Sequence, residues 1–281
     1  MPRRSYDALV LDLDGTLVQD DGSVHPDTHR GLRRARDAGV VVMVATGRSE
    51  AGSIDLLREL DLDTPAAVYN GAALYCPRRG ELIQSHTLGQ KIMANLAELV
   101  RTDSDLFAVV AVAGDKFALP PRDASERTVL ETFSGLRIVS PDGMNPSDPI
   151  RVSLFSDRYS NSQALADRVE SSLTEDAFLT HFPMALLPQC RDSRHHIVDV
   201  QPPCRGKAEA LAYLEAQHGI PPSRVVAIGD SDNDIAMLEA AGLGVAMGNA
   251  LPAIAALADR VIGDCNSPTI ARLIEEVFLA A

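Results

Sequence analysis

The sequence contains no tryptophan, and aromatic residues make up only 4% of its 281 positions. Basic residues are also scarce relative to acidic ones, since 26 Lys and Arg stand against 39 Asp and Glu and give a formal net charge of −13. Proteins that bind nucleic acids need positive charge to meet the phosphate backbone and often stack bases on aromatic side chains. We therefore expect no nucleic acid among the partners of this protein.

Cysteine pairs and long apolar runs are missing too. The four cysteines form no CxxC pair and accompany no histidine cluster, which argues against a zinc site and a disulfide framework. No stretch approaches the ~18 apolar residues of a membrane-spanning helix, and the basic start MPRR leads into an Asp-bearing strand without a signal-peptide core. These features predict a cytoplasmic protein with reduced thiols and no membrane anchor.

What is present is an alternation of strand and helix patterns in the first eighty residues. The predicted strands cover residues 8–13, 40–45 and 66–69, and the predicted helices between them cover residues 26–38 and 50–60. Pro26 suits the first turn of a helix, and Gly39 suits the left-handed position after its end. Because crossover connections are right-handed, the three strands are expected to run parallel.

The same alternation returns near the C-terminus. It predicts a helix over residues 207–218, a strand over 224–228, a helix over 233–241 and a strand over 244–246, followed by a helix, a strand and a helix. The middle of the chain instead shows hairpin-like and turn-rich segments. We expect an α/β fold with a Rossmann-like parallel-sheet core, formed by residues 1–82 and 202–281, and an inserted α+β unit of residues 83–201.

Polar residues gather where the predicted strands end. Asp12 and Asp14 follow the first strand, Thr46-Gly47-Arg48 the second, Asn70 the third, and Asp230 the late strand VVAIG. Ligands of open parallel sheets bind beyond the carboxyl ends of the strands. A buried carboxylate without a partner costs several kcal/mol, so these aspartates must meet a cation, hydrogen bonds or a reacting group.

Three aspartates in one crevice would repel one another unless a cation were present. Mg²⁺ answers this requirement, because it favours carboxylate, carbonyl and phosphoryl oxygens and retains several waters. Thr46 and nearby backbone N–H groups offer neutral donors to a phosphoryl group, and Lys207, at the start of a predicted helix, offers a positive charge. The sequence thus predicts a place where a metal and a phosphate meet.

The ordered motifs DLDGT, TGR, a lysine at a helix start and GDSDND resemble the haloacid dehalogenase (HAD) superfamily, and YNGA, RGKAEAL and VAMGNA resemble its Cof-like phosphatases. The resemblance implies an aspartyl-phosphate mechanism with Asp12 as nucleophile and Asp14 as acid and base. It also implies Mg²⁺ bound by Asp12, Asp230 and the Asp14 carbonyl. It assigns phosphate binding to Thr46 and Lys207, whereas Asn233 and Asp234 hold the loop or contact the phosphate and metal waters.

The resemblance further implies that the inserted unit is a cap and that the substrate is a small phosphate ester. Sugar phosphates are the substrates expected first, and phosphorylated cofactors are expected second. Gly47 belongs to the phosphate-binding loop of the TGR motif. Arg48 either contacts the substrate or braces the loop, and Asn70 either faces the substrate or serves only the Asn-Gly turn. No motif in the sequence indicates a particular oligomeric state.

Two other functions fit the same motifs. A phosphotransferase or phosphomutase would form the same aspartyl-phosphate but deliver it to a hydroxyl group. A catalytically silent binding or regulatory protein would keep the fold without turnover. The second alternative is weakened because every core motif carries a chemically competent residue.

Overall fold

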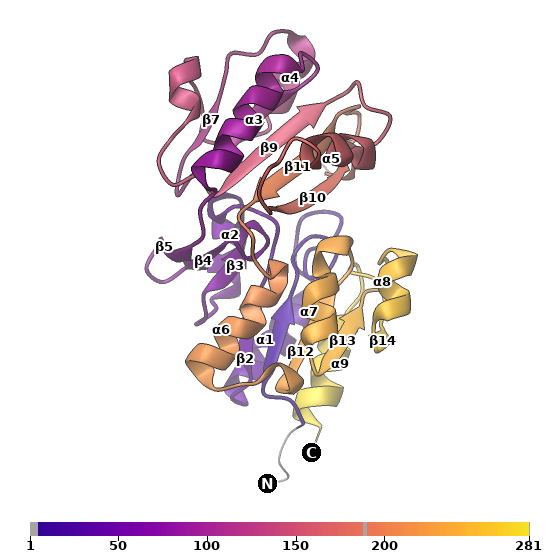
Figure 1. Ribbon diagram of the computed structural model, residues 1–281. Coiled ribbons are helices and arrows are strands. Elements are labelled where there is room, and N and C mark those ends of the chain that lie inside the picture. The colour runs from indigo at the N-terminus through magenta and orange to yellow at the C-terminus, as the bar shows by residue number, and fades with distance from the viewer. Residues whose placement is uncertain (1–4, 188–189, 281) are drawn as a thin grey trace. The chain divides into compact units, whose positions relative to one another are not determined.

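The computed structural model describes residues 5–187 and 190–280. It divides into two compact units, the first made of Met1–Gln84 together with Arg205–Ala281 and the second of Ser85–Cys204. The sequence patterns placed these borders after residues 82 and 201. Figure 1 colours the first unit indigo to purple and orange to yellow, because both ends of the chain contribute to it.

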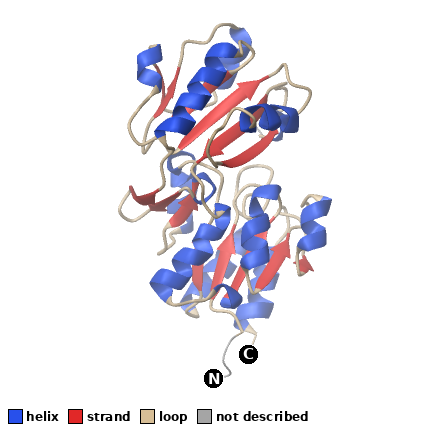
Figure 2. Ribbon diagram, in the orientation of Figure 1, coloured by secondary structure: helices blue, strands red, loops and turns tan. Residues whose placement is uncertain are grey.

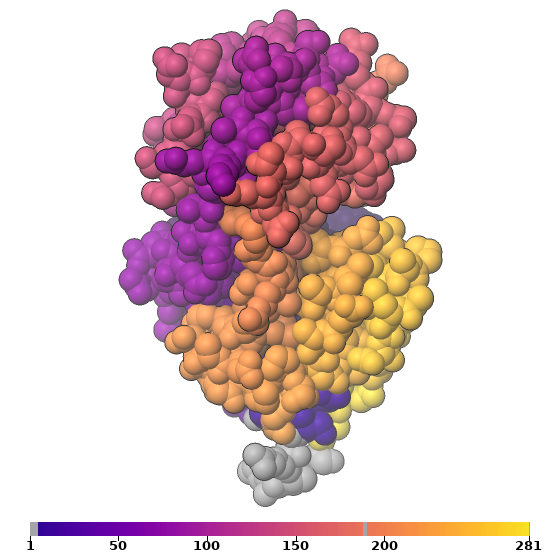
Figure 3. Space-filling view, in the orientation of Figure 1, coloured from indigo at the N-terminus to yellow at the C-terminus, as the bar shows by residue number. Residues whose placement is uncertain are grey.

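The first unit is built on a five-stranded sheet in the order β14-β13-β12-β1-β2, with every neighbouring pair parallel. Its strands are β1 Ala8–Leu11, β2 Val41–Val44, β12 Val225–Gly229, β13 Leu243–Ala246 and β14 Arg260–Val261. All residues of β1 and β12 are buried, as expected for central strands covered on both faces. Figure 3 accordingly shows little of the indigo segment on the face that it displays. The predicted α/β core with a parallel sheet is confirmed.

Helices alternate with these strands (Figure 2). They are α1 Pro26–Asp37, α2 Glu50–Leu60, α6 Glu209–His218, α7 Ile235–Ala240, α8 Pro252–Leu257 and α9 Thr269–Ile274. Apolar residues of α6, α7 and α8 pack with one side of the sheet in a single cluster, and α1 packs against α9. The helix predicted over 233–241 is shorter than expected, because a 3₁₀ turn at Asp232–Asp234 precedes α7.

The third predicted strand departs from the prediction. β3 Ala66–Val68 is parallel to the main sheet only at an isolated bridge between Ala45 and Ala67, and it pairs antiparallel with β4 Ala73–Cys76. Together with β5 Glu81–Ser85 it forms a separate three-stranded sheet. The reason is local, since Tyr69, Asn70 and Gly71 all have positive φ angles and turn the chain back on itself.

The second unit is an α+β structure with a six-stranded sheet in the order β10-β11-β9-β6-β7-β8, antiparallel except between β7 and β8. The strands are β6 Phe107–Ala111, β7 Lys116–Ala118, β8 Leu136–Ile138, β9 Arg151–Ser156, β10 Phe178–Pro183 and β11 His196–Gln201. Helices α3 Gln90–Thr102 and α5 Ser162–Glu170 cover one face, and α4 Ala124–Leu130 packs on the other. The predicted α+β character of the insertion is confirmed.

None of the helices within the described residues combines the length and the apolar composition needed to cross a membrane.

Candidate active site

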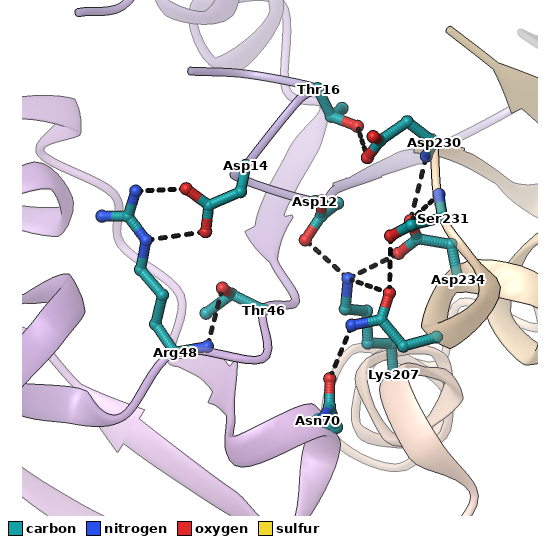
Figure 4. A network of polar contacts seen from close by, with 11 residues as sticks. Asp12, Asp14, Thr16, Thr46, Arg48, Asn70, Lys207, Asp230, Ser231 and Asp234 are labelled. Atoms are coloured by element: carbon teal, nitrogen blue, oxygen red, sulfur yellow. Dashed lines mark hydrogen bonds and ion pairs between the residues drawn. The ribbon is translucent and has the colours of Figure 1, made fainter. Parts of the chain in front are cut away.

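The candidate site lies in the first unit, in the loops that follow β1, β2 and β12. Because these strands are parallel, their carboxyl ends meet at one edge of the sheet. Asp12 and Asp14 come directly after β1, Thr46 comes after β2, and Asp230 comes directly after β12. Figure 4 shows these side chains around Lys207, which comes from a 3₁₀ turn at Gly206–Ala208. The sequence pattern predicts Lys207 at the start of a helix. In the structure Lys207 lies in the 3₁₀ turn that immediately precedes α6.

The Lys207 ammonium group joins two of the loops. Lys207 is only 1% exposed, and its Nζ donates hydrogen bonds to Asp12 Oδ1 at 2.6 Å and to Asp234 Oδ1 at 2.7 Å. It also donates to Asn233 Oδ1 at 3.1 Å. Ion pairs of this kind are costly to desolvate and depend on accurate geometry. The lysine therefore fixes the loop after β1 against the loop after β12.

The burial of these charges shifts their titration. Burial raises the pKa of Asp12 well above its ordinary value, and the Lys207 charge opposes this rise. Burial, followed by the negative charge of Asp234, raises the pKa of Asp230 to about 6. Burial alone would lower the pKa of Lys207, but the charges of Asp12 and Asp234 outweigh it and raise that pKa. These pKa shifts arise from the burial of closely spaced negative charges around one lysine.

The loop after β12 is shaped by Asp234. Its Oδ2 accepts hydrogen bonds from the backbone N–H groups of Asp230 at 2.9 Å and Ser231 at 3.0 Å. The chain passes so close to this carboxylate that a Cβ at Gly229 would overlap it. The motifs leave two roles open for Asp234, holding the loop or contacting phosphate and metal waters. Its hydrogen bonds to Lys207 and to two backbone N–H groups of the loop fit the first role.

Asp14 points to another part of the site. Both oxygens of its carboxylate accept from the Arg48 guanidinium, Oδ2 from Nε at 2.8 Å and Oδ1 from Nη2 at 2.5 Å (Figure 4). Arg48 also donates through Nη1 to the Gly52 carbonyl at 3.2 Å. Of the two roles that the sequence left open for Arg48, these contacts fit bracing of the loop. The pairing with Asp14 was not foreseen.

The TGR loop lies against Asn70 and Asn233. The Arg48 N–H donates to Thr46 Oγ1 at 3.1 Å, and the Asn233 Nδ2 donates to Asn70 Oδ1 at 2.9 Å. A Cβ at Gly47 would come within 3.0 Å of the Asn70 amide oxygen, so the small residue permits this close approach. The structure thus gathers Thr46, Gly47, Asn70 and Asn233 beside Lys207.

Two further residues of the site were not singled out from the sequence. Thr16 donates through Oγ1 to Asp230 Oδ1 at 3.2 Å, and Asn249 donates through Nδ2 to the Gly15 carbonyl at 2.7 Å. The motifs contained the signal, because Thr16 ends DLDGT and Asn249 lies in VAMGNA. Both residues connect the loop after β1 to the C-terminal part of the chain.

The site has the composition that a divalent metal requires. Asp12, Asp230 and Asp234 each place a carboxylate oxygen within 4.8 Å of the others, and Lys207 is bonded to only two of the three. The negative charge of this group exceeds the single positive charge of the lysine. Because Asp234 is already held by Lys207 and two backbone N–H groups, Asp12 and Asp230 are the carboxylates best suited to hold the ion.

Comparison with known proteins agrees with this geometry. A family model described as haloacid dehalogenase-like hydrolase matches residues 9–274. The chain therefore belongs to the haloacid dehalogenase-like hydrolases, and the predicted resemblance to this superfamily and its Cof-like phosphatases is confirmed.

Two similar proteins of assigned activity are phosphatases. The chain is 30% identical over 282 residues to pyridoxal phosphate phosphatase YbhA of Escherichia coli, covering 95% of this chain and 96% of the relative. It is 26% identical over 272 residues to 5-amino-6-(5-phospho-D-ribitylamino)uracil phosphatase YitU of Bacillus subtilis, covering 96% and 97%. The predicted enzyme class, a phosphoric monoester hydrolase, is confirmed.

A solved haloacid dehalogenase-like hydrolase from Bacteroides thetaiotaomicron has a TM-score of 0.77 at 24% identity, with 97% of this chain and 100% of that chain covered. A sugar phosphatase of HAD subclass IIB has a TM-score of 0.79 at 21% identity, with 96% and 98% covered. At these identities the two structures establish the shared fold.

Proposed function

We propose that the protein is a Mg²⁺-dependent phosphatase that hydrolyses small phosphorylated metabolites through an aspartyl-phosphate intermediate. The observation that carries the proposal is the buried cluster in which Lys207 bridges Asp12 and Asp234 beside Asp230. Such a cluster combines an anionic nucleophile with a fixed positive charge, and it leaves further negative charge for a dication to balance. Phosphoryl transfer requires these groups, a nucleophile and positive charges that stabilise the phosphoryl oxygens.

In the first step an oxygen of the Asp12 carboxylate attacks phosphorus, and the bond from phosphorus to the alcohol oxygen of the ester breaks. Asp14, in its protonated form, gives its proton to that departing oxygen. Lys207 and the donors of the Thr46–Arg48 loop would bind the phosphoryl oxygens while their charge redistributes. The products of this step are the free alcohol and a phosphorylated Asp12.

In the second step a water molecule attacks the phosphorus of the aspartyl-phosphate. Asp14 removes a proton from that water, the bond from phosphorus to Asp12 breaks, and inorganic phosphate leaves. Asp12 is then a carboxylate again and Asp14 is again protonated. One residue serves as acid and base, so both half-reactions depend on the mobility of the Asp14 side chain away from Arg48.

Asp12 and Asp230, together with the main-chain carbonyl of Asp14, would hold the Mg²⁺ ion. When bound, the ion would neutralise charge on the nucleophile and on the phosphoryl oxygens. Thr16 supports Asp230 in this task through its hydrogen bond to Oδ1. Removal of the ion by a chelator should therefore stop phosphate release.

The names of the relatives support small phosphorylated metabolites as the substrate class. One relative is a phosphatase of pyridoxal phosphate and another of a phosphorylated ribitylaminouracil. We propose sugar phosphates and phosphorylated cofactors as the substrates, and we propose the role of residues 85–204 as a cap on the family likeness alone. Catalytic efficiency should be higher on these small esters than on phosphopeptides or on phosphorylated nucleic acid ends.

The experiment is a screen of small phosphate esters for release of inorganic phosphate, with Mg²⁺ and with an excess of chelator. Phosphate release that needs Mg²⁺ supports the proposal. Addition of a sugar acceptor to the active mixture separates hydrolysis from the phosphotransferase or mutase alternative, which would transfer phosphate to the sugar. An absence of turnover on the whole panel would favour the silent binding protein.

A further inference from the structure

The peptide of Gly15 is one of the points that hold the loop carrying both proposed catalytic aspartates, and it is held through the backbone. Gly15 has a φ angle of 76°, a conformation that residues with a side chain rarely adopt. A Cβ at this position would overlap Asp230 Oδ2, so the backbone of Gly15 passes directly against the proposed metal ligand. The position of this one peptide sets where Asp14, immediately before it, lies relative to Asp230.

Asn249 holds the Gly15 peptide from outside the loop. Its Nδ2 donates to the Gly15 carbonyl at 2.7 Å, and its Oδ1 accepts from the Cys265 N–H at 3.0 Å. The Asn249 amide thus donates one hydrogen bond and accepts another at the same time, and the two bonds together fix the orientation of the amide plane. No aliphatic side chain of similar size could make this connection.

The segment that carries Asn249 is itself anchored on the loop after β12. The Met247 N–H donates to the Gly229 carbonyl at 3.0 Å, and the Leu251 N–H donates to the Asp230 carbonyl at 3.1 Å. Asn249 lies between these two anchors in the chain. It therefore connects the backbone of Asp230 to the backbone of Gly15 by a route that is independent of Lys207.

We propose that Asn249 is a positioning residue, which fixes the Gly15 peptide and thereby the spacing of Asp12, Asp14 and Asp230 for Mg²⁺ binding and phosphoryl transfer. This inference rests on the proposed function. The two hydrogen bonds of Asn249 go to main-chain groups of Gly15 and Cys265, and its side chain is exposed, so we expect its loss to leave the core intact. Partners that orient metal ligands from outside typically contribute a factor of ten or more to metal affinity or activity.

The chain offers a matched control in Asn266. This residue is also exposed and also ties the N-terminal loop to the C-terminal part of the first unit, because its Nδ2 donates to Asp20 Oδ2 at 3.0 Å and its Oδ1 accepts from the Asp20 N–H at 3.1 Å. It contacts neither Gly15 nor any of the three aspartates through these bonds. If Asn249 only held the two parts of the unit together, replacing either asparagine would change Mg²⁺ affinity and kcat to the same extent.

The test compares Asn249→Ala and the nearly isosteric Asn249→Leu with Asn266→Ala and Asn266→Leu. Mg²⁺ affinity is measured on the substrate-free protein by calorimetric titration, and kcat and KM are measured at saturating Mg²⁺. We expect both Asn249 variants to bind Mg²⁺ about tenfold more weakly and to lose kcat about tenfold with little change in KM, whereas the Asn266 variants match the parent. Melting temperatures of all four variants identify any general loss of folding, and the Leu variant retains the packing volume.

The inference is overturned if the Asn249 variants bind Mg²⁺ and turn over substrate as well as the Asn266 variants. It is also overturned if the affinity loss is the same in both pairs. Failure of the proposed function gives a different result, because a parent protein that binds Mg²⁺ but releases no phosphate from any ester refutes the phosphatase assignment. The Mg²⁺ titrations still decide the role of Asn249 in that event.

Discussion

Asp14 is the residue on which both proposed half-reactions depend. Replacement Asp14→Asn removes the proton donor and the base while it keeps the size of the side chain. We expect kcat to fall by roughly 10²–10⁴-fold with an alkyl phosphate, the usual range for loss of a general acid or base. The loss should be smaller for an aryl phosphate, whose alcohol leaves without much help from an acid. Steady-state rates with the two esters check this, and an unchanged rate with the alkyl ester would remove Asp14 from the mechanism.

Lys207 is the residue on which the folded site depends. In Lys207→Ala, Asp12 and Asp234 stay buried without their cation, and breaking a buried ion pair in this way costs about 3–5 kcal/mol. Urea unfolding without Mg²⁺ measures the change in the free energy of unfolding. The control is Lys91→Ala, since Lys91 also binds a carboxylate, Glu175 at 2.9 Å, but its side chain is 75% exposed. Equal stability changes in the two variants would contradict the account of the buried cluster.

At the level of helices and strands, the sequence predicts the core well and its edge less well. β1 and β12 are short apolar runs buried on both faces, and α1 begins at the predicted Pro26, because these elements follow local composition. Local composition does not predict that β3 belongs to the separate three-stranded sheet. The turn that diverts it consists of Tyr69, Asn70 and Gly71 in left-handed conformations, and a tyrosine gives no signal for such a conformation.

The loop between β1 and α1 allows a paired test of backbone geometry. Gly15 and Gly22 both have positive φ angles, of 76° and 86°, but a Cβ at Gly22 would meet nothing within 4 Å whereas a Cβ at Gly15 would overlap the Asp230 carboxylate. Both substitutions to Ala incur a strain of roughly 1–2 kcal/mol. Only Gly15→Ala should also weaken Mg²⁺ binding and slow turnover. Thermal melts and Mg²⁺ titrations of both variants measure this, and equal Mg²⁺ affinities would show that the Gly15 backbone does not set the position of Asp230.

At the scale of the whole molecule, the order of the motifs predicts which loops lie together. It does not predict which side chains of these loops bond to one another. The carboxyl ends of parallel strands necessarily share one edge of a sheet, so Asp12, Thr46 and Asp230 could be brought together from the sequence. The Arg48 pairing with Asp14 depends on side-chain orientation. The Asn249 bond to Gly15 joins residues 234 positions apart, a separation over which local patterns carry no information.

The division into two units gives a prediction for metal removal. The proposed ligands Asp12 and Asp230 both belong to the first unit, and a ligand stabilises only the part of a protein that must be folded to bind it. Mg²⁺ should slow amide hydrogen exchange in the loops after β1 and β12 and leave the sheet of the second unit unchanged, and a chelator should reverse the effect. Asp230→Ala should abolish the difference. Retained protection in that variant would exclude Asp230 as a ligand.

The most direct test of the central claim is to trap the phosphorylated protein. The parent protein is mixed with a labelled phosphate ester and Mg²⁺, quenched in acid during turnover, digested and analysed by mass spectrometry. The account predicts a phosphoryl group on Asp12 in the parent, and neither label nor turnover in Asp12→Asn, which remains folded because the amide oxygen can still accept from Lys207. A phosphoryl group on another residue, or full turnover by Asp12→Asn, would contradict it.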